Sequence, residues 1–487
     1  MNSIAKTAFL DAQERRGVFS CETLMLVIVS DLHLTGNAFS GTLPATAFRI
    51  FRERLRDMAY DASWRSDGRY RPIEQVDLVL LGDILDFIRS ELWPCVSPGD
   101  PEYVRPWSDH ASPVFQRKVA EIADSIIDKN AAALEVIRSF SDSREVMTLP
   151  PATADGGVAK VSREFSSPDR VPLKVRTHYV AGNHDWFLHL RGDAFNAIRQ
   201  RVVSAMCLAN PAACPFPHEP LESPALAQLC EQHRAWFRHG DVFDPLNCEG
   251  TRDGSSLGDA IVVDLLNRFA VTVRARMGEE LPKECIEGLR QIDYVHPLLL
   301  IPVWVNGLLR RTCDEDSAAK VKAIWDELVE EFLEMQFVRG RKPFLPPRTL
   351  DKLALALRFS RGVSFEKLSR LFSWLHGKTG GGDGRPSFED ALEEKVVRNR
   401  SAQSVVYGHT HRHDVVPLDV NYSRDGALDQ MYLNSGTWRV VHEQARRNPA
   451  QEVFTNYLVM TYLGLYKKDE RGGRPFEAWS GTLALPR

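Results

Sequence analysis

The sequence lacks an apolar stretch long enough to cross a membrane. Its most apolar segment runs from Pro297 to Leu309 and is interrupted by Pro302 and Asn306, whereas a transmembrane helix needs about 20 apolar residues. No continuous apolar run follows the first seven residues, so we also expect no signal peptide. These absences predict a cytoplasmic protein without a transmembrane segment.

The cysteine content and the net charge exclude few further classes of protein. The eight cysteines are scattered and form no Cys-x-x-Cys pair, so we expect reduced thiols. The formal net charge is −4, which gives no support for a nucleic-acid binder with a broad basic surface. Hydrophobic residues make up 44% and charged residues 26% of the 487 residues, as in an ordinary globular protein of two or more domains.

Five polar motifs follow short apolar runs, which we expect to be buried strands at 24–30, 76–81, 177–181, 235–238 and 403–407. In the same order the motifs are Asp31-Leu32-His33, Gly82-Asp83-Ile84-Leu85-Asp86, Gly182-Asn183-His184-Asp185, His239-Gly240-Asp241 and Gly408-His409-Thr410-His411. Polar residues at the carboxyl ends of such strands commonly form active sites. Asp31 and His33 can reach one metal ion if their strand continues, because residues two apart share a face.

Together these motifs resemble those of the calcineurin-like metallophosphoesterases, which hydrolyse phosphate esters and anhydrides with two metal ions. The resemblance covers roughly residues 24–250 and 400–470. It implies an α/β fold, a four-layer αββα sandwich of two packed sheets with a large, mostly helical insertion. The domains would be a core in two parts, 1–250 and 401–487, and an insertion at 251–400, which we call the cap.

The resemblance also assigns the side chains. Two metals held about 3.5–4 Å apart need a shared carboxylate, and the resemblance assigns this role to Asp83, because the Gly-Asp motif of the family supplies the bridging ligand. Asp31, His33 and His411 would complete one site, and Asn183, His239 and His409 the other. Nitrogen and oxygen ligands suit Mn²⁺, our first expectation, or Fe²⁺, Zn²⁺ or Co²⁺ better than Ca²⁺. A water between the ions would attack phosphorus.

His184 resembles the catalytic histidine of this superfamily, and Asp185 is expected to orient its imidazole. Asp86 and Asp241 are interpreted as supporting or capping residues. Asn37, Arg412 and the stretch 434–438 follow motifs or end a strand, and they could face a substrate. No role is assigned to the other histidines, which include His110, His178, His189, His218, His233, His296, His376, His413 and His442.

Between the fourth and fifth motifs the sequence predicts helices at 259–269, 321–337, 350–359, 365–375 and 388–397. The glycine-rich run 377–384 is interpreted as a connector, because Phe372 stands where a P-loop requires glycine. A smaller elaboration at 87–175 contains a predicted helix near 114–140. The cap is expected to lie over the metal site.

These features predict a phosphohydrolase acting on a phosphorylated small molecule such as a nucleotide, a nucleotide-sugar or a phospholipid-like diester. The alternatives are a nuclease, a protein phosphatase, or a regulatory protein with a degenerate site. The apolar cap faces could pack internally, form a homodimer or hold a lipid. The context of the fourth motif is similar to that of UDP-2,3-diacylglucosamine hydrolases, which however typically have Arg at the position of His184 and a much smaller cap.

Overall fold

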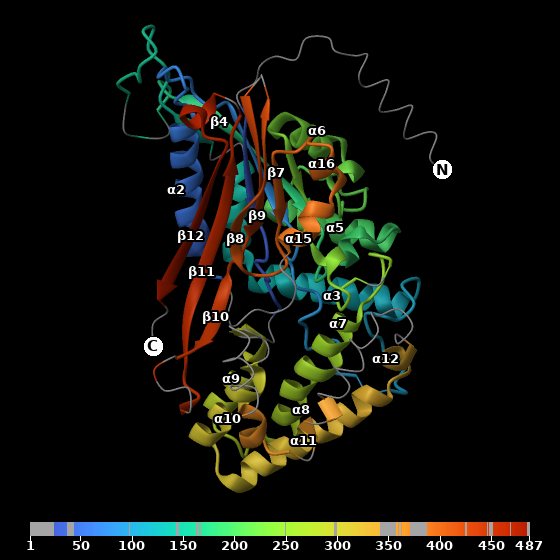
Figure 1. The fold of residues 1–487 in the computed structure, drawn as a ribbon. Coiled ribbons are helices and arrows are strands. Elements are labelled where there is room, and N and C mark those ends of the chain that lie inside the picture. The colour runs from blue at the N-terminus through green and yellow to red at the C-terminus, as the bar shows by residue number, and fades with distance from the viewer. Residues whose placement is uncertain are drawn as a thin grey trace.

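The computed structural model describes residues 24–36, 43–96, 98–142, 146–161, 164, 167–248, 250–296, 300–340, 357–358, 360–361, 363–370, 387–423, 426–445, 447, 451–467 and 469–484. In these residues the protein is a mixed α/β structure with two β-sheets (Figure 1). Asn37, the connector 377–384, and most of the helix predicted at 350–359 lie outside the described residues.

The larger sheet has eight strands in the order β3-β4-β2-β1-β11-β10-β6, with β12 paired to β11. They are β1 (Leu24–Val29), β2 (Gln75–Leu81), β3 (Met147–Leu149), β4 (Val171–Val180), β6 (Val295–His296), β10 (Arg439–Gln444), β11 (Phe454–Leu465) and β12 (Phe476–Ala484). Strands β1, β2 and β4 are parallel neighbours. All residues of β1 and β2 are buried, which explains their continuous apolar pattern.

The smaller sheet has the order β5-β7-β9-β8. Its strands are β5 (Ala235–Phe237), β7 (Ser404–Tyr407), β8 (His413–Ser423) and β9 (Gly426–Ser435). Strands β5, β7 and β9 are parallel. Leu26 and Ile28 of the larger sheet share one apolar cluster with Phe237, Val406 and Leu433 of the smaller sheet, so the two sheets pack face to face.

Helices cover the outer faces of both sheets. Against the larger sheet lie α2 (Ala45–Ala62), α3 (Pro113–Lys129), α4 (Ala131–Ser141) and α5 (Asp193–Met206). Against the smaller sheet lie α15 (Phe388–Glu393) and α16 (Lys395–Arg398), through Ala391 and Val397. Helix α6 (Pro224–His233) contributes Leu226 and Leu229 to the cluster between the sheets. Short 3-10 helices occupy Trp186–His189, Pro220–Glu222, Asp241–Phe243, Ile292–Tyr294 and Glu470–Gly473.

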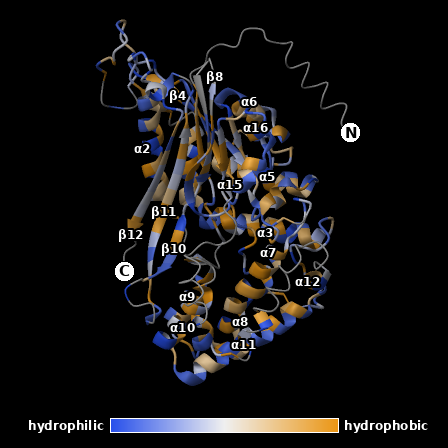
Figure 2. Cartoon of the chain, in the orientation of Figure 1, coloured by the Kyte–Doolittle hydropathy of each residue, from blue (hydrophilic) through white to orange (hydrophobic). Residues whose placement is uncertain are grey.

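The cap is mostly helical in its described part, as predicted. It contains α7 (Leu257–Ala260), a π-helix (Ile261–Asn267), α8 (Arg268–Met277), α9 (Lys283–Leu289), α10 (Ile301–Thr312), α11 (Glu315–Glu334) and α12 (Gln336–Gly340). These helices share their own apolar cluster, which includes Phe269, Leu308 and Trp325, and they gather below the strands in Figure 1. In Figure 2 apolar residues are prominent on α7 and α8, whereas β10 and β11 carry both hydrophilic and apolar residues. No helix in the described part of the chain is long and apolar enough to cross a membrane.

Several contacts join the cap to the sheets. Strand β6 pairs with β10 and so extends the larger sheet. The Asn267 side chain donates to the Ile88 carbonyl at 3.0 Å. Arg105 and Asp264, each 2% exposed, form an ion pair with 2.9 Å between Nε and Oδ1. Segments of 251–400 therefore pack as part of the sheet assembly, and the cap is not a detached lid.

The ion pair between Arg105 and Asp264 generates a stability prediction. Arg105→Met leaves a buried carboxylate without its cation, which should lower the free energy of unfolding by about 3–5 kcal/mol. Arg117→Met is the matched control, because Arg117 pairs with Glu102 at 2.6 Å while both side chains are about half exposed. That control should cost less than about 1 kcal/mol. Denaturant unfolding of both variants checks this, and equal losses would contradict it.

Candidate metal centre

The first two motifs are joined at the carboxyl ends of β1 and β2. The Asp31 amide donates to the Gly82 carbonyl at 3.0 Å, and the His33 amide donates to the Asp83 carbonyl at 2.9 Å. Parallel pairing of the two strands thus continues beyond their ends and places both motifs at one edge of the sheet. The carboxyl ends of β5 and β7, in the facing sheet, carry the fourth and fifth motifs.

Left-handed backbone is concentrated in these motifs. Ten non-glycine residues of the described chain have positive φ, and five of them are predicted ligands: Asp31 (55°), His33 (44°), Asp83 (55°), His409 (66°) and His411 (57°). Such conformations are uncommon outside glycine and gather at functional sites. Because β1 ends at Val29, Asp31 and His33 approach the site from a left-handed turn. The strand does not continue through them, so a shared strand face is not what brings these two side chains together.

One set of predicted ligands, the first ligand group, comprises Asp31, His33, Asp83 and His411. One ligand atom from each lies within 4.8 Å of all the others. His411 Nε2 is 3.3 Å from Asp31 Oδ1 and 2.9 Å from His33 Nε2. His33 Nε2 is 3.7 Å from Asp83 Oδ2.

A second ligand group, Asp83, His239 and His409, meets the same distance limit of 4.8 Å. Asn183 belongs with it, because its Oδ1 lies 3.1 Å from His239 Nε2 and 3.0 Å from His409 Nδ1. His239 Nε2 is 3.2 Å from Asp83 Oδ2. Asp83 is therefore shared by both groups, and the structure brings all seven predicted ligands together.

The hydrogen bonds on the far side of the imidazoles show that these residues fit metal ions. His239 Nδ1 donates to the Leu81 carbonyl at 3.0 Å, and a carbonyl can only accept. In neutral His239 the Nε2 lone pair therefore faces the Asn183 oxygen, which is also an acceptor. His33 Nδ1 likewise bonds Asp86 Oδ2 at 2.8 Å. Bonds of this kind fix the tautomer of metal-binding histidines, and two facing acceptors are stable only with a proton or a metal ion between them.

The charged groups of the centre also require positive charge close to the buried carboxylates. Burial opposes the charged form of His239, but the Asp83 and Asp31 carboxylates outweigh it and raise the pKa of His239 to about 10. Burial also opposes ionisation of Asp83, yet the neighbouring imidazoles, His239 foremost, hold the pKa of Asp83 well below its usual value. Either protons or divalent cations can supply this charge.

Glycine is required where the motifs approach each other. Gly82 has a φ of 81°, and a Cβ there would overlap the His239 ring. A Cβ on Gly182 would overlap Asp83 Oδ1. The absence of a side chain at both positions lets the strand-end turns close around the shared carboxylate.

His184 lies beside the ligand groups, but its orienting partner differs from the prediction. His184 Nδ1 bonds Asp86 Oδ1 at 2.8 Å. Asp185 Oδ1 instead accepts from the Gly182 amide at 2.6 Å, and Oδ2 accepts from the Ile84 amide at 2.8 Å and from a buried tyrosine hydroxyl. The assignment of Asp185 as the group that orients His184 is wrong, because its carboxylate points into the backbone turns. Asp86 is the carboxylate that contacts the His184 ring.

The stretch 434–438 supports the backbone of the first and fifth motifs through hydrogen bonds. Asn434 is fully buried and donates to the Gly408 carbonyl at 2.9 Å. Thr437 donates to the Asp31 carbonyl at 2.8 Å. These side chains therefore support the turns and do not face a substrate, whereas Arg412 is exposed.

Sequence reasoning missed one supporting carboxylate. Asp244 Oδ2 lies 3.2 Å from His409 Nε2, which leaves Nδ1 of that ring directed at Asn183. Its sequence signal is weak, namely a carboxylate three residues after Asp241 in the fourth motif. Asp241 itself pairs with Arg252 at 2.6 Å.

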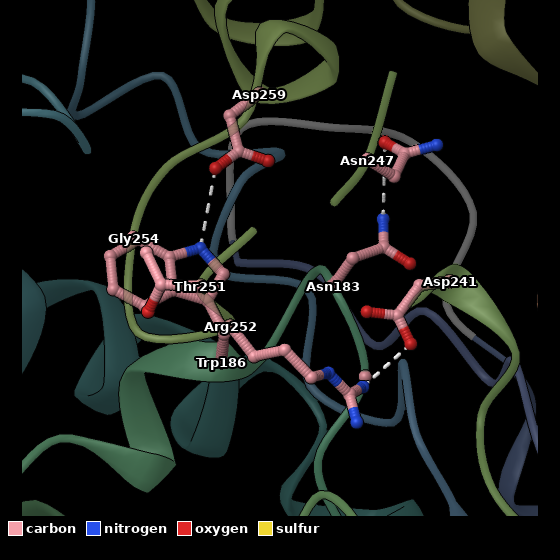
Figure 3. A pocket seen from close by; sticks show the side chains of 9 residues that line it. Asn183, Trp186, Asp241, Asn247, Thr251, Arg252, Gly254 and Asp259 are labelled. Atoms are coloured by element: carbon pink, nitrogen blue, oxygen red, sulfur yellow. Dashed lines mark hydrogen bonds and ion pairs between the residues drawn. The ribbon is translucent and has the colours of Figure 1, made fainter. Parts of the chain in front are cut away.

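A pocket borders the centre at Asn183 (Figure 3). It is lined by Gly182, Asn183, Trp186, Asp241, Asn247, Thr251, Arg252, Gly254 and Asp259. The imidazoles of His184, His409 and His411 are 15–17% exposed, so the centre can be approached from outside. In comparisons with known proteins, no protein-family model and no curated protein matches this chain.

The partner of His184 can be tested in the metal-free protein by an NMR titration. The Asp86 carboxylate helps to raise the pKa of His184 to about 10 against the effect of burial. Asp86→Asn removes a charge that favours the imidazolium, so the pKa of His184 should fall. Asp185→Asn should change it much less. A larger fall in Asp185→Asn would show that Asp185 orients the ring after all.

Proposed function

We propose that the protein is a metal-dependent phosphohydrolase of the calcineurin-like metallophosphoesterase type, with two divalent ions. The observation that supports this most strongly is that Asp83 belongs to both ligand groups, as a carboxylate bridging two ions must. Two face-to-face sheets with helices on their outer faces support the finer assignment of a four-layer αββα sandwich. The cap at 251–400 would interrupt its core.

In this proposal the first ligand group holds one ion and the second, with Asn183, holds the other. Imidazole and oxygen donors suit Mn²⁺, Fe²⁺, Zn²⁺ or Co²⁺. When bound, such a pair lowers the pKa of water and neutralises charge on a phosphoryl group. The protein's own contribution is to fix the ligands and their tautomers. Asp86 holds the His33 ring in this way, and the Leu81 carbonyl holds the His239 ring.

His184 is the proposed catalytic group of the chain itself. Its Nδ1 is held by Asp86, and its ring centre lies 4.8 Å from that of His33. Since the side chain is 17% exposed, its Nε2 can donate to a phosphoryl oxygen or to the leaving oxygen. Asp86 thus serves both a predicted metal ligand and the proposed catalytic histidine.

Positive charge beside the centre supports a phosphorylated substrate. Arg439 Nη1 lies 3.3 Å from His411 Nδ1. The guanidinium carbons of Arg439 and Arg89 lie 4.9 and 5.1 Å from the ring centre of Tyr294. Tyr294 belongs to the cap, so the cap reaches the basic edge of the site. We infer that the cap influences which phosphorylated small molecule is hydrolysed.

The bridging role of Asp83 gives the main test of the function. Asp83→Asn removes a charged ligand from both ions, so metal content and hydrolysis should fall together. Elemental analysis and assays with Mn²⁺ on p-nitrophenyl phosphate, bis-p-nitrophenyl phosphate, UDP-sugars and single-stranded DNA check this, with Asp193→Asn as an exposed control. Retention of both ions of the dinuclear centre in Asp83→Asn would contradict the bridge. Wild-type protein holding two ions but hydrolysing none of these would contradict the enzyme.

Replacing His184 separates metal binding from chemistry. His184→Asn should keep both ions, while turnover falls by about 10²–10⁴-fold, the usual effect of losing such a group. If His184 protonates the leaving oxygen, the defect should shrink for p-nitrophenolate, which needs little protonation, and grow for alkyl esters. Loss of an ion, or full turnover on every ester, would show that the proposed role is wrong.

A further inference from the structure

A second cluster of metal-binding side chains lies outside the proposed dinuclear centre. It consists of His189, His218 and Asp253, and one ligand atom from each lies within 4.8 Å of the other two. His189 ends a 3-10 helix after the third motif, and Asp253 lies in the segment that leads into α7. Neither histidine takes part in the proposed reaction.

The two imidazoles are aimed at one carboxylate. His189 Nε2 lies 3.5 Å and His218 Nε2 lies 4.0 Å from Asp253 Oδ1. Their other nitrogens are bonded to carbonyls, His189 Nδ1 to Phe216 at 2.7 Å and His218 Nδ1 to Ala181 at 3.2 Å. Because carbonyls only accept, both Nδ1 atoms carry the proton and both Nε2 lone pairs face Asp253 when the rings are neutral.

His218 makes the cluster more than a surface ion pair. Its side chain is 3% exposed, and its Nε2 is buried without a hydrogen-bond partner in the described structure. Burial and the charge of Arg252 hold the pKa of His218 well below its usual value, so the ring is neutral, as a metal ligand must be. An ion pair between His189 and Asp253 would not explain why a buried lone pair points at the same carboxylate.

We propose that His189, His218 and Asp253 bind a third divalent transition-metal ion, for which Zn²⁺ is the natural probe. Two imidazoles and a carboxylate are an established Zn²⁺ ligand set with an open position. Tetrahedral ligands about 2.0–2.1 Å from zinc lie roughly 3.3 Å apart. The three ligand atoms therefore reach tetrahedral spacing if the Asp253 side chain moves slightly inward. That side chain is 56% exposed.

The position of this ion suggests what it would do. His218 bonds the Ala181 carbonyl, directly before the turn that carries Asn183. Asp253 stands between Arg252 and Gly254, which line the same pocket as Asn183 (Figure 3). The ion would tie the segment entering the cap to the turn that carries a predicted ligand of the dinuclear centre.

Counting ions in full-length variants tests this site. Protein stripped with a chelator is reloaded with ZnCl₂ and desalted, and its zinc is measured by elemental analysis. We expect three ions in wild type, two in Asp253→Ala and three in the control Asp193→Ala, which also loses an exposed carboxylate. Isothermal titration should show the site's affinity falling by at least about 10-fold in Asp253→Ala, since even groups that only support a ligand contribute that much.

The outcome is separable from that of the dinuclear proposal. If no dinuclear centre exists, wild type should hold one ion and Asp253→Ala none. Asp83→Asn should lose the dinuclear ions and keep this one. His189→Ala gives a second variant at a partly exposed position, so the test does not depend on substituting buried His218. Unchanged zinc content and affinity in both Asp253→Ala and His189→Ala would overturn the site and leave only an ion pair.

Discussion

Two buried carboxylates impose the main constraint on this molecule. Asp31 and Asp83 are at most 1% exposed, and buried charge is tolerated only where opposite charge is close. Parallel pairing of β1 and β2 brings the two carboxylates together, and imidazoles from the facing sheet approach them. The left-handed turns and the glycines at 82 and 182 are consequences of this crowding, because ordinary extended backbone would keep the ligands apart.

The centre depends on packing between the sheets as much as on its own contacts. The larger sheet supplies Asp31, His33 and Asp83, and the smaller sheet supplies His239, His409 and His411. Their spacing is therefore set by the apolar cluster that joins the sheets. Cap contacts extend the same assembly, since β6 joins the larger sheet and the cap carries Tyr294 to the edge of the centre.

The sequence predicted what chemistry and burial impose directly. Strands buried on both faces leave continuous apolar runs, so β1 and β2 were predicted nearly to the residue. The candidate ligands could be proposed because few residue types bind metal ions, and the structure brings those side chains together. The direction in which a side chain points leaves no comparable pattern in the sequence. Asp185 adjoins His184 in sequence, yet Asp86 meets its ring. His189, His218 and Asp253 form no spaced motif, and only folding brings them together. Packing of α15 and α16 on the smaller sheet was hidden for the same reason.

We propose that the Asp83 carboxylate is shared by two divalent ions held between the sheets. Anomalous diffraction from crystals of the Mn²⁺-loaded protein tests it most directly, because it locates the ions without reference to activity. The account predicts two peaks about 3.5–4 Å apart on either side of the Asp83 carboxylate, one beside Asp31 and His411 and one beside Asn183 and His239. A single peak, or two peaks that do not share Asp83, would contradict it.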